Sequence, residues 1–296
     1  MFTAKMHADE VDINFHLVRK LLTAQFPDWA NLELKLIRPE GTDNVMYKLG
    51  DDKVIRLPRT EGSATNVKKE CRWLQHLAAL LPIVIPTLLA EGRPSADYNL
   101  PWYICQFLEG KNPNTEMMLD HHQTAIDLGN FVSTMQKIDS KNGPKCRRGQ
   151  PLNTRDQETR EAINLLSNTY DADLVTDIWE SALAAPIWSK PPVWIHGDLH
   201  AGNLLAQNGR ITAIVDFGSA GIGDPACDLM VAWTLLTSET RDTFRSIVQP
   251  DDATWARARG WALTFGIVAY PYYRLSNPVF ASIAKRALDE VLTDYK

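Results

Sequence analysis

Residues 193–229 read VWIHGDLHAGNLLAQNGRITAIVDFGSAGIGDPACDL, and this stretch is more informative about function than the rest of the chain. Two short apolar runs, 204–207 and 210–215, flank the dipeptide Asn208-Gly209. Asn-Gly between such runs is the strongest short-range signal of a tight β-hairpin. The sequence therefore predicts two antiparallel strands joined by a two-residue turn.

Three oxygen-bearing side chains gather at the open end of this predicted hairpin. An uninterrupted register sets Asn203 opposite Ile214 and diagonal to Asp216, and diagonal neighbours in a sheet lie about 7–8 Å apart. Asp198, which precedes Asn203 by five residues, falls in the loop at the same end. The arrangement predicts a hard-cation site with a base beside it. The alternative is that these residues only form turns or cap helices. For any one of them taken alone, this is the commoner role.

The same residues resemble the signature of the aminoglycoside phosphotransferase family, relatives of protein kinases that phosphorylate small molecules. The shared pattern is H-x-D-x-x-x-x-N from His196, D-F-G from Asp216, and G-D-P-A-C-D-L ending at Leu229. The resemblance implies a two-lobed, kinase-like α+β fold and magnesium-dependent transfer of a nucleotide γ-phosphate to a hydroxyl. It makes Asp198 the base that accepts the hydroxyl proton, and Asn203 and Asp216 the magnesium ligands.

Polar residues around the signature are expected to support it. We interpret His196 and His200 as residues that position the loop backbone. Asp224 and Pro225 predict the start of a helix, as N-cap and first helical residue. Asp228, on the fourth helical residue, is interpreted as a brace for the catalytic loop.

The resemblance implies two lobes. Residues 1–109 would form a lobe with an antiparallel sheet for nucleotide binding, and residues 110–296 a mostly helical lobe with the catalytic loop, metal site and substrate-binding helices. In the first, apolar spacing predicts helices at about 11–26 and 63–81 and strands at about 32–38, 45–49, 53–57 and 102–108. In the second it predicts helices at about 117–138, 155–167, 171–184, 228–236, 239–247, 251–270 and 279–292. The loop 140–153 is polar and made cationic by Lys141, Lys145, Arg147 and Arg148. It is interpreted as a solvated connector, with a binding role as the alternative.

A buried ion pair is predicted in the smaller lobe. Glu70 falls inside the apolar stripe of the helix at 63–81, where an ionised carboxylate needs a cationic partner. Arg56, on the strand at 53–57, is the nearest candidate upstream. By the resemblance, this pair replaces the kinase lysine and glutamate at the nucleotide phosphates, and Val54 lines the adenine pocket. The alternative is a purely structural ion pair.

The strand at 102–108 is where the resemblance places the purine. Gln106 and Leu108 are the expected main-chain partners of adenine, and the small Cys105 leaves room for guanine. The expected cofactors are Mg²⁺ and ATP, with GTP as the alternative donor. Residues 40–44 are either a phosphate-covering loop or an ordinary hairpin turn.

Composition narrows the class of partner. The 296 residues, 45% hydrophobic and 23% charged, are ordinary for a globular protein of about two lobes. A formal net charge of −5 gives no footprint for nucleic acid and suits a cationic small-molecule partner. No apolar run approaches the roughly 18 residues that cross a membrane, and the first ten residues lack a signal-peptide core. A cytoplasmic location is therefore expected. The four cysteines form no C-x-x-C pair, which argues against zinc and a disulfide framework.

The acceptor is the most open part of the prediction. An aminoglycoside-type antibiotic leads, which implies a role in antibiotic resistance. A macrolide becomes the better choice if C-terminal aromatics line an apolar pocket, and residues 270–274 predict a kinked helix end that could present rings. Glu239, Asp242 and Asp289 are candidates for binding ammonium groups, although exposed charge is the commoner role. A primary-metabolite kinase for an amino alcohol or sugar is a further alternative. So is a nucleotide-binding pseudokinase, because Arg56 replaces the usual lysine.

Overall fold

The computed structural model describes residues 11–38, 43–113 and 119–295. The chain divides into two compact units, Met1–Ala79 with Ile85–Glu109 and Leu80–Val84 with Gly110–Lys296. The first unit contains a five-stranded sheet in the order β1-β2-β3-β5-β4, in which every neighbouring pair is antiparallel. Its strands are β1 (Leu34–Leu36), β2 (Asn44–Leu49), β3 (Lys53–Pro58), β4 (Leu88–Gly92) and β5 (Trp102–Gln106).

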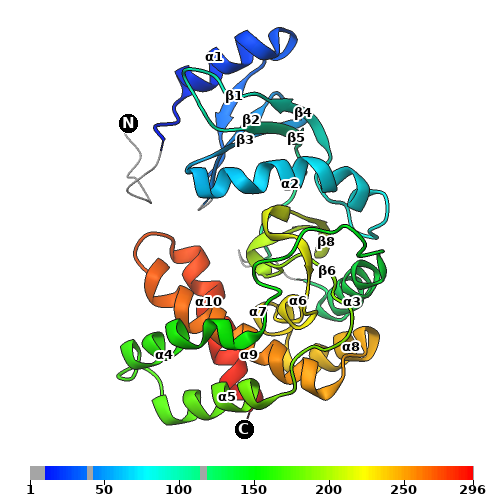
Figure 1. Ribbon diagram of the computed structural model, residues 1–296, viewed down its shortest axis with the longest axis vertical. Coiled ribbons are helices and arrows are strands. Elements are labelled where there is room, and N and C mark those ends of the chain that lie inside the picture. The colour runs from blue at the N-terminus through cyan, green and yellow to red at the C-terminus, as the bar shows by residue number, and fades with distance from the viewer. Residues whose placement is uncertain (1–10, 39–42, 114–118, 296) are drawn as a thin grey trace. The chain divides into compact units, whose positions relative to one another are not determined.

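Two helices accompany this sheet, α1 (Phe15–Gln25) and α2 (Glu61–Ala78), and in Figure 1 the sheet lies between them. Val18 of α1 belongs to the same buried cluster as Ile55 and Leu57 of β3. Since side chains alternate along a strand, Val54 and Arg56 fall on the opposite face of β3. The sequence therefore gives β3 one apolar face and one face that carries a cation.

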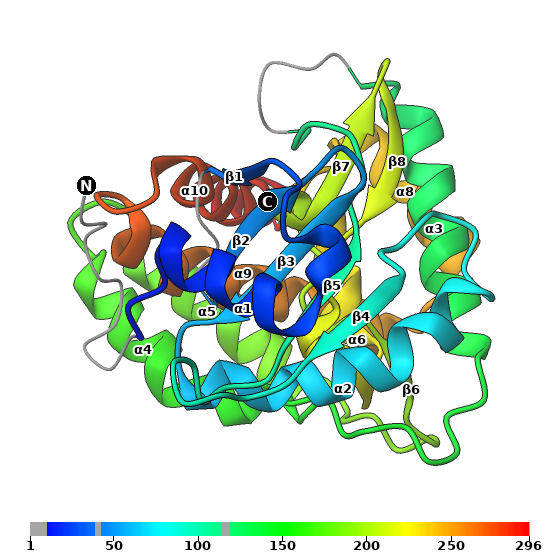
Figure 2. The same ribbon diagram turned by 90° about the horizontal axis from the view of Figure 1, so that it is seen from above.

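The second unit is mostly helical. Its helices are α3 (His121–Lys137), α4 (Asp156–Leu165), α5 (Ala172–Ala184), α6 (Ala226–Leu229), α7 (Val231–Thr234), α8 (Ser238–Val248), α9 (Asp252–Tyr273) and α10 (Pro278–Asp294). Two small antiparallel sheets join β6 (Val193–Ile195) to β9 (Gly221–Gly223) and β7 (Leu204–Gln207) to β8 (Arg210–Ile214). Figure 2 shows the β7–β8 hairpin beside α3, which contacts β8. None of the helices in the described parts of the chain has the length and hydrophobicity of a membrane span.

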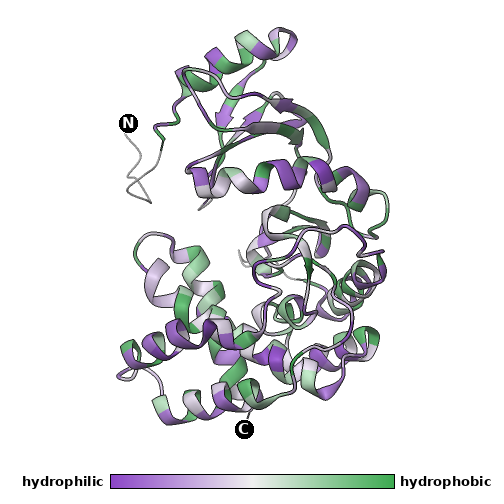
Figure 3. Cartoon of the chain, in the orientation of Figure 1, coloured by the Kyte–Doolittle hydropathy of each residue, from purple (hydrophilic) through white to green (hydrophobic). Residues whose placement is uncertain are grey.

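Helix α9 organises the second unit, because α4, α5, α6 and α10 all pack against it. The approach of α10 is close: a Cβ on Gly266 would lie 2.8 Å from the carbonyl oxygen of Ala284. Figure 3 shows hydrophobic and hydrophilic residues interspersed along the helices of this unit. The helix also continues through Pro271 to Tyr273, three residues beyond its predicted end.

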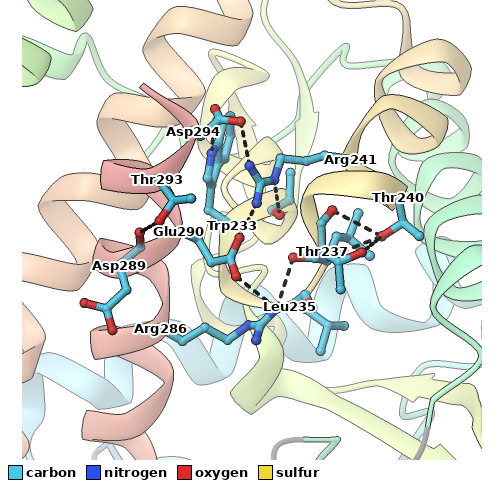
Figure 4. A network of polar contacts seen from close by, with 12 residues as sticks. Trp233, Leu235, Thr237, Thr240, Arg241, Arg286, Asp289, Glu290, Thr293 and Asp294 are labelled. Atoms are coloured by element: carbon cyan, nitrogen blue, oxygen red, sulfur yellow. Dashed lines mark hydrogen bonds and ion pairs between the residues drawn. The ribbon is translucent and has the colours of Figure 1, made fainter. Parts of the chain in front are cut away.

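A buried polar network ties α10 to α7 and α8 (Figure 4). The guanidinium of Arg241 donates to Asp294 Oδ1 at 2.6 Å and also contacts the carboxylate of Glu290. Trp233 Nε1 donates to the second oxygen of Asp294 at 3.1 Å. The side chain of Arg241 is 4% exposed, so these bonds satisfy a charge that would otherwise be buried alone.

Several elements differ from the sequence-based expectation. Strand β4 was not predicted, and neither were the three-residue strands β6 and β9. The helix expected at 228–236 is two short helices, α6 and α7, separated at Met230. The segment Leu80–Val84, placed by sequence with the smaller lobe, belongs to the second unit. There Ile214 N donates to Val84 O at 3.0 Å.

Candidate active site

The loop after β6 carries Asp198, and a buried carboxylate fixes its shape. Asp228 accepts hydrogen bonds from His196 N at 2.6 Å and from Gly197 N at 2.8 Å. Burial raises the pKa of Asp228 to about 7, against the lowering effect of the two backbone N–H donors. The prediction that Asp228 braces the catalytic loop is confirmed. The helix was expected to begin at Pro225, with Asp224 as its N-cap. It begins one residue later, at Ala226, and Asp224 Oδ1 accepts a hydrogen bond from Ala226 N at 3.0 Å.

The hairpin forms with the predicted turn but with a different register. Asn208 and Gly209 both have positive φ, 50° and 78°, as a two-residue turn of this kind requires. A bulge on β8 then pairs Leu204 with Ile214, so the prediction of Asn203 opposite Ile214 is wrong. The extra residue that a bulge inserts explains the shift by one position.

The predicted base and both predicted metal ligands are nevertheless brought into adjoining segments. Val215 N donates to the carbonyl oxygen of Asn203 at 2.9 Å, which places Asn203 beside the residue before Asp216. The side-chain nitrogen of Asn203 donates to the carbonyl oxygen of Asp198 at 2.9 Å. This bond ties the side chain of Asn203 to the backbone of the loop that carries Asp198. Asp216 has a left-handed backbone, φ 64°, an unusual conformation outside glycine that clusters at functional sites.

These donors suit magnesium held largely through nucleotide phosphates. Amide and carboxylate oxygens are its preferred ligands, and it commonly binds through one or two carboxylates together with phosphates and waters. Across the described residues there is no group of three or more histidine, cysteine, aspartate and glutamate side chains placed to hold a metal. Asn203 and Asp216 carry oxygens of these two kinds, and their role as magnesium ligands stays a prediction.

Both histidines of the loop are buried and make backbone contacts, as expected of positioning residues. His196 Nε2 lies 3.0 Å from Val215 O, and Nδ1 of His200 accepts from Gly202 N at 3.0 Å. Burial lowers the pKa of His196 to about 4 and that of His200 to about 3. Both rings are thus neutral at pH 7.

The basic loop 140–153 contributes a residue that the sequence analysis did not single out. A guanidinium nitrogen of Arg148 forms an ion pair with Asp198 Oδ1. The backbone around it is tied to β9: Cys146 N donates to Ile222 O at 3.0 Å, and Ile222 N donates to Pro144 O at 2.7 Å. The prediction of a solvated connector is wrong for this part of the loop. The loop also packs closely on β9, because a Cβ added to Gly149 would lie 2.8 Å from Gly223 Cα.

In the first unit, the predicted ion pair is present on the cation-bearing face of β3. Arg56 Nη2 lies 3.7 Å from Glu70 Oε1, and the two side chains are only 7% and 3% exposed. Val54 shares that face and is buried, paired across the sheet with Cys105 of β5. The contact is as predicted, and its role at a nucleotide stays a prediction.

The expected purine contacts lie at and just after the end of β5. The main-chain N–H of Gln106 donates to Thr87 O at 2.9 Å, so only its carbonyl remains for the role expected of this residue. Leu108 follows in the segment that closes the first unit. Burial raises the pKa of Cys105 to about 12, which keeps its thiol neutral. Of the expected phosphate-covering loop, residues 39–42 lie outside the described part of the chain.

Fold and loop together are those of a phosphotransferase. The model of the phosphotransferase enzyme family matches residues 34–261. The chain belongs to this family, which confirms the predicted family and the predicted class of enzyme. No curated protein gives a significant match to the sequence.

Solved structures with the same fold extend over nearly the whole chain. The GDP complex of wild-type aminoglycoside 2'-phosphotransferase-IIIa has a TM-score of 0.73 and 20% identity, covering 96% of this chain and 100% of that one. The GDP and kanamycin complex of APH(2")-IIIa has a TM-score of 0.71 and 18% identity, with the same coverage. The apoenzyme of macrolide 2'-phosphotransferase MphH from Brachybacterium faecium has a TM-score of 0.58 and 22% identity, covering 91% and 98%. These similarities confirm the kinase-like α+β fold.

Proposed function

We propose that this phosphotransferase moves the γ-phosphate of ATP, or of GTP, to a hydroxyl of a small molecule, with Asp198 as the base. Asp198 orients the hydroxyl and accepts its proton. The hydroxyl oxygen forms a bond to the γ-phosphorus, the bond from that phosphorus to the β,γ-bridging oxygen breaks, and a nucleoside diphosphate leaves. The observation that carries this proposal is the loop itself, in which Asn203 and Asp228 hold the backbone on either side of Asp198.

Each unit contains residues to which we assign a role in nucleotide binding. Asn203 and Asp216 would hold Mg²⁺, which supplies charge neutralisation at the phosphates when it is bound. Arg56, oriented by Glu70, would contact the phosphates, because arginine keeps the charge of the usual lysine and can grip an anion with two N–H groups. Val54, together with the main chain of Gln106 and Leu108, would line the purine pocket.

The leading acceptor is an aminoglycoside-type antibiotic. Structures of the same fold include complexes with kanamycin and gentamicin, and the net charge of −5 suits a polycation. Of the three carboxylates expected to bind ammonium groups, Asp289 is already paired with Lys285 at 2.6 Å and with the Tyr170 hydroxyl at 3.1 Å. Glu239 and Asp242, both exposed on α8, remain candidates.

A macrolide is the second candidate, because an aromatic series runs from the catalytic loop to the surface of the same unit. His200 stacks on Phe265 at 5.1 Å between ring centroids, and Phe280 lies 5.3 Å from His200 and 4.8 Å from Tyr273. Tyr272, next in the series at 4.7 Å, is 63% exposed. An exposed ring that is linked to the catalytic loop by successive aromatic contacts favours an acceptor with a large apolar face.

One assay separates these acceptors from each other and from a pseudokinase. The purified chain is incubated with Mg²⁺ and ATP or GTP, and with kanamycin, a macrolide, choline or a sugar, and phosphorylated product is followed by mass spectrometry. We expect product with one antibiotic class. Product only with choline or the sugar would assign a metabolic kinase. Nucleotide binding without any transfer or hydrolysis would contradict the enzymatic proposal.

A further inference from the structure

The basic loop 140–153 reaches the predicted base, Asp198, through Arg148. Its guanidinium contacts Asp198 Oδ1, and the side chain is 40% exposed, so part of the guanidinium faces solvent. Oδ1 itself is shielded from solvent and accepts no hydrogen bond of good geometry from the described residues. The charge of Arg148 is therefore the main balance for a buried carboxylate oxygen.

The backbone that presents Arg148 is built into the site. Residues on both sides of it bond to β9 and to the residue that follows it: Cys146 N donates to Ile222 O at 3.0 Å, and Asp224 N donates to Gly149 O at 3.0 Å. A Cβ on Gly197, in the catalytic loop, would lie 2.6 Å from Cys146 Sγ. The arginine thus comes from a segment packed on the catalytic loop, which limits the positions its side chain can take.

The two histidines of the catalytic loop do not supply a cation in this arrangement. His200 lies closest, with Nε2 3.4 Å from Asp198 Oδ1. Its other nitrogen, Nδ1, accepts a hydrogen bond from Gly202 N at 3.0 Å, and Nδ1 of His196 accepts one from Asp198 N at 3.3 Å. A nitrogen that accepts carries no proton, so neither imidazole is doubly protonated.

We propose that Arg148 is a positioning residue of the phosphoryl transfer, which orients the Asp198 carboxylate for the acceptor hydroxyl through their ion pair. The inference rests on the proposed function. A planar guanidinium on one carboxylate oxygen restricts rotation of the carboxylate, and leaves the second oxygen to meet the hydroxyl. Misplacement of a catalytic group by about 1 Å can lower a rate by about 100-fold, which sets the size of the expected effect.

The test compares Arg148→Gln and Arg148→Lys with Arg147→Gln, whose arginine is exposed on the same loop. Transfer is measured with the acceptor that the wild type phosphorylates, and Mg²⁺–ATP affinity by calorimetry. For Arg148→Gln we expect kcat to fall by about 10- to 100-fold, with nucleotide affinity unchanged within about twofold. Arg148→Lys should recover part of the loss, and Arg147→Gln should match the wild type.

Chemical rescue distinguishes positioning from damage to the fold. Guanidinium ion at millimolar concentration should raise the kcat of Arg148→Ala and leave Arg147→Ala unchanged. A kcat of Arg148→Gln within threefold of the wild type would overturn the proposal, as would an increase, which would mean that the ion pair restrains the base. An equal loss in Arg147→Gln would also overturn it. If the wild type transfers phosphate to no acceptor, the proposed function fails first and this role fails with it.

Discussion

At the scale of single residues, the catalytic loop depends on backbone positions that tolerate few side chains. Gly197 has φ +75° and lies between Cys146 and Asp228, with no room for a Cβ. Asp228 holds this same residue through its main-chain N–H. The loop is thus shaped by contacts whose atoms do not take part in the reaction.

Gly197→Ala should disable the loop. The left-handed backbone alone costs about 1–2 kcal/mol for a residue with a Cβ, and the added carbon would lie 2.8 Å from Ser219 O. We expect phosphoryl transfer to fall at least tenfold and the urea midpoint to decrease. Gly62→Ala is the control: its nearest neighbour, Thr60 Oγ1, is 3.6 Å away within a helix, so this variant should keep full activity. Equal activity in the two variants would contradict the account of the loop.

Asp228 predicts a pH-dependent stability. Its pKa is raised to about 7 in the folded chain from 3.8, so its favourable contribution is present below about pH 4 and is lost as the pH rises to about 7. Asp228→Asn removes this titration. The difference in free energy of unfolding between the wild type and this variant should therefore decrease as the pH rises, by up to about 1.4 kcal/mol per pH unit between pH 4.5 and 7. Urea unfolding at several pH values measures it, with the exposed Asp177→Asn as control; a loss that grows with pH would contradict it.

At the scale of elements, the regular features of the sequence predicted more than the irregular ones. The Asn208-Gly209 turn, the α2 stripe with Glu70 inside it and most helices of the second unit are as expected. A bulge leaves no clear mark in an apolar pattern, so the β8 register was wrong by one. Arg148 was missed because a long-range ion pair from a loop has no periodicity to reveal it.

A buried ion pair anchors the segment after β9 to the long helix α9. Arg257 donates to both oxygens of Asp224, at 2.8 and 3.1 Å, and the side chains are 3% and 6% exposed. Removing one partner leaves the other charge buried, which costs about 3–5 kcal/mol. The sequence did not indicate that these two residues form a pair, because 33 positions separate them.

Arg257→Met should therefore lower the free energy of unfolding by about 3–5 kcal/mol in urea titrations. The double variant Asp224→Asn with Arg257→Met should recover part of this loss, because it leaves no unpaired charge. Arg245→Met is the matched control, since its partner Asp252 is 98% exposed and exposed pairs contribute about 1 kcal/mol or less. Comparable losses for Arg257→Met and Arg245→Met would refute the distinction.

At the scale of the whole molecule, the chain shares its fold with solved phosphotransferase structures over nearly its whole length, and the proposed function requires it to bind a nucleotide. A ligand that binds only the folded protein stabilises it, by about 2.7 kcal/mol at a concentration 100 times its Kd. Mg²⁺–ATP or Mg²⁺–GTP should therefore raise the unfolding temperature, and the larger rise identifies the donor. The acceptor could not be predicted from the sequence, because no spaced motif in the chain marks a site for it.

Arg56→Gln should weaken this nucleotide effect. Removing the guanidinium takes away the proposed phosphate contact and leaves Glu70 without the partner seen at 3.7 Å. We expect the nucleotide-induced rise in unfolding temperature to be reduced by at least half, whereas Arg72→Gln, which alters an exposed arginine of α2, should retain it. An undiminished rise in Arg56→Gln would make the ion pair structural only.

The central claim, that Asp198 is the base of phosphoryl transfer, is tested most directly by Asp198→Asn. Transfer to the identified acceptor and Mg²⁺–nucleotide affinity are measured on the same preparation, with Asp177→Asn as control. We predict that transfer falls by at least about 100-fold, within the range of general base catalysis, while nucleotide affinity changes by less than about threefold. Transfer within tenfold of the wild type would contradict the assignment.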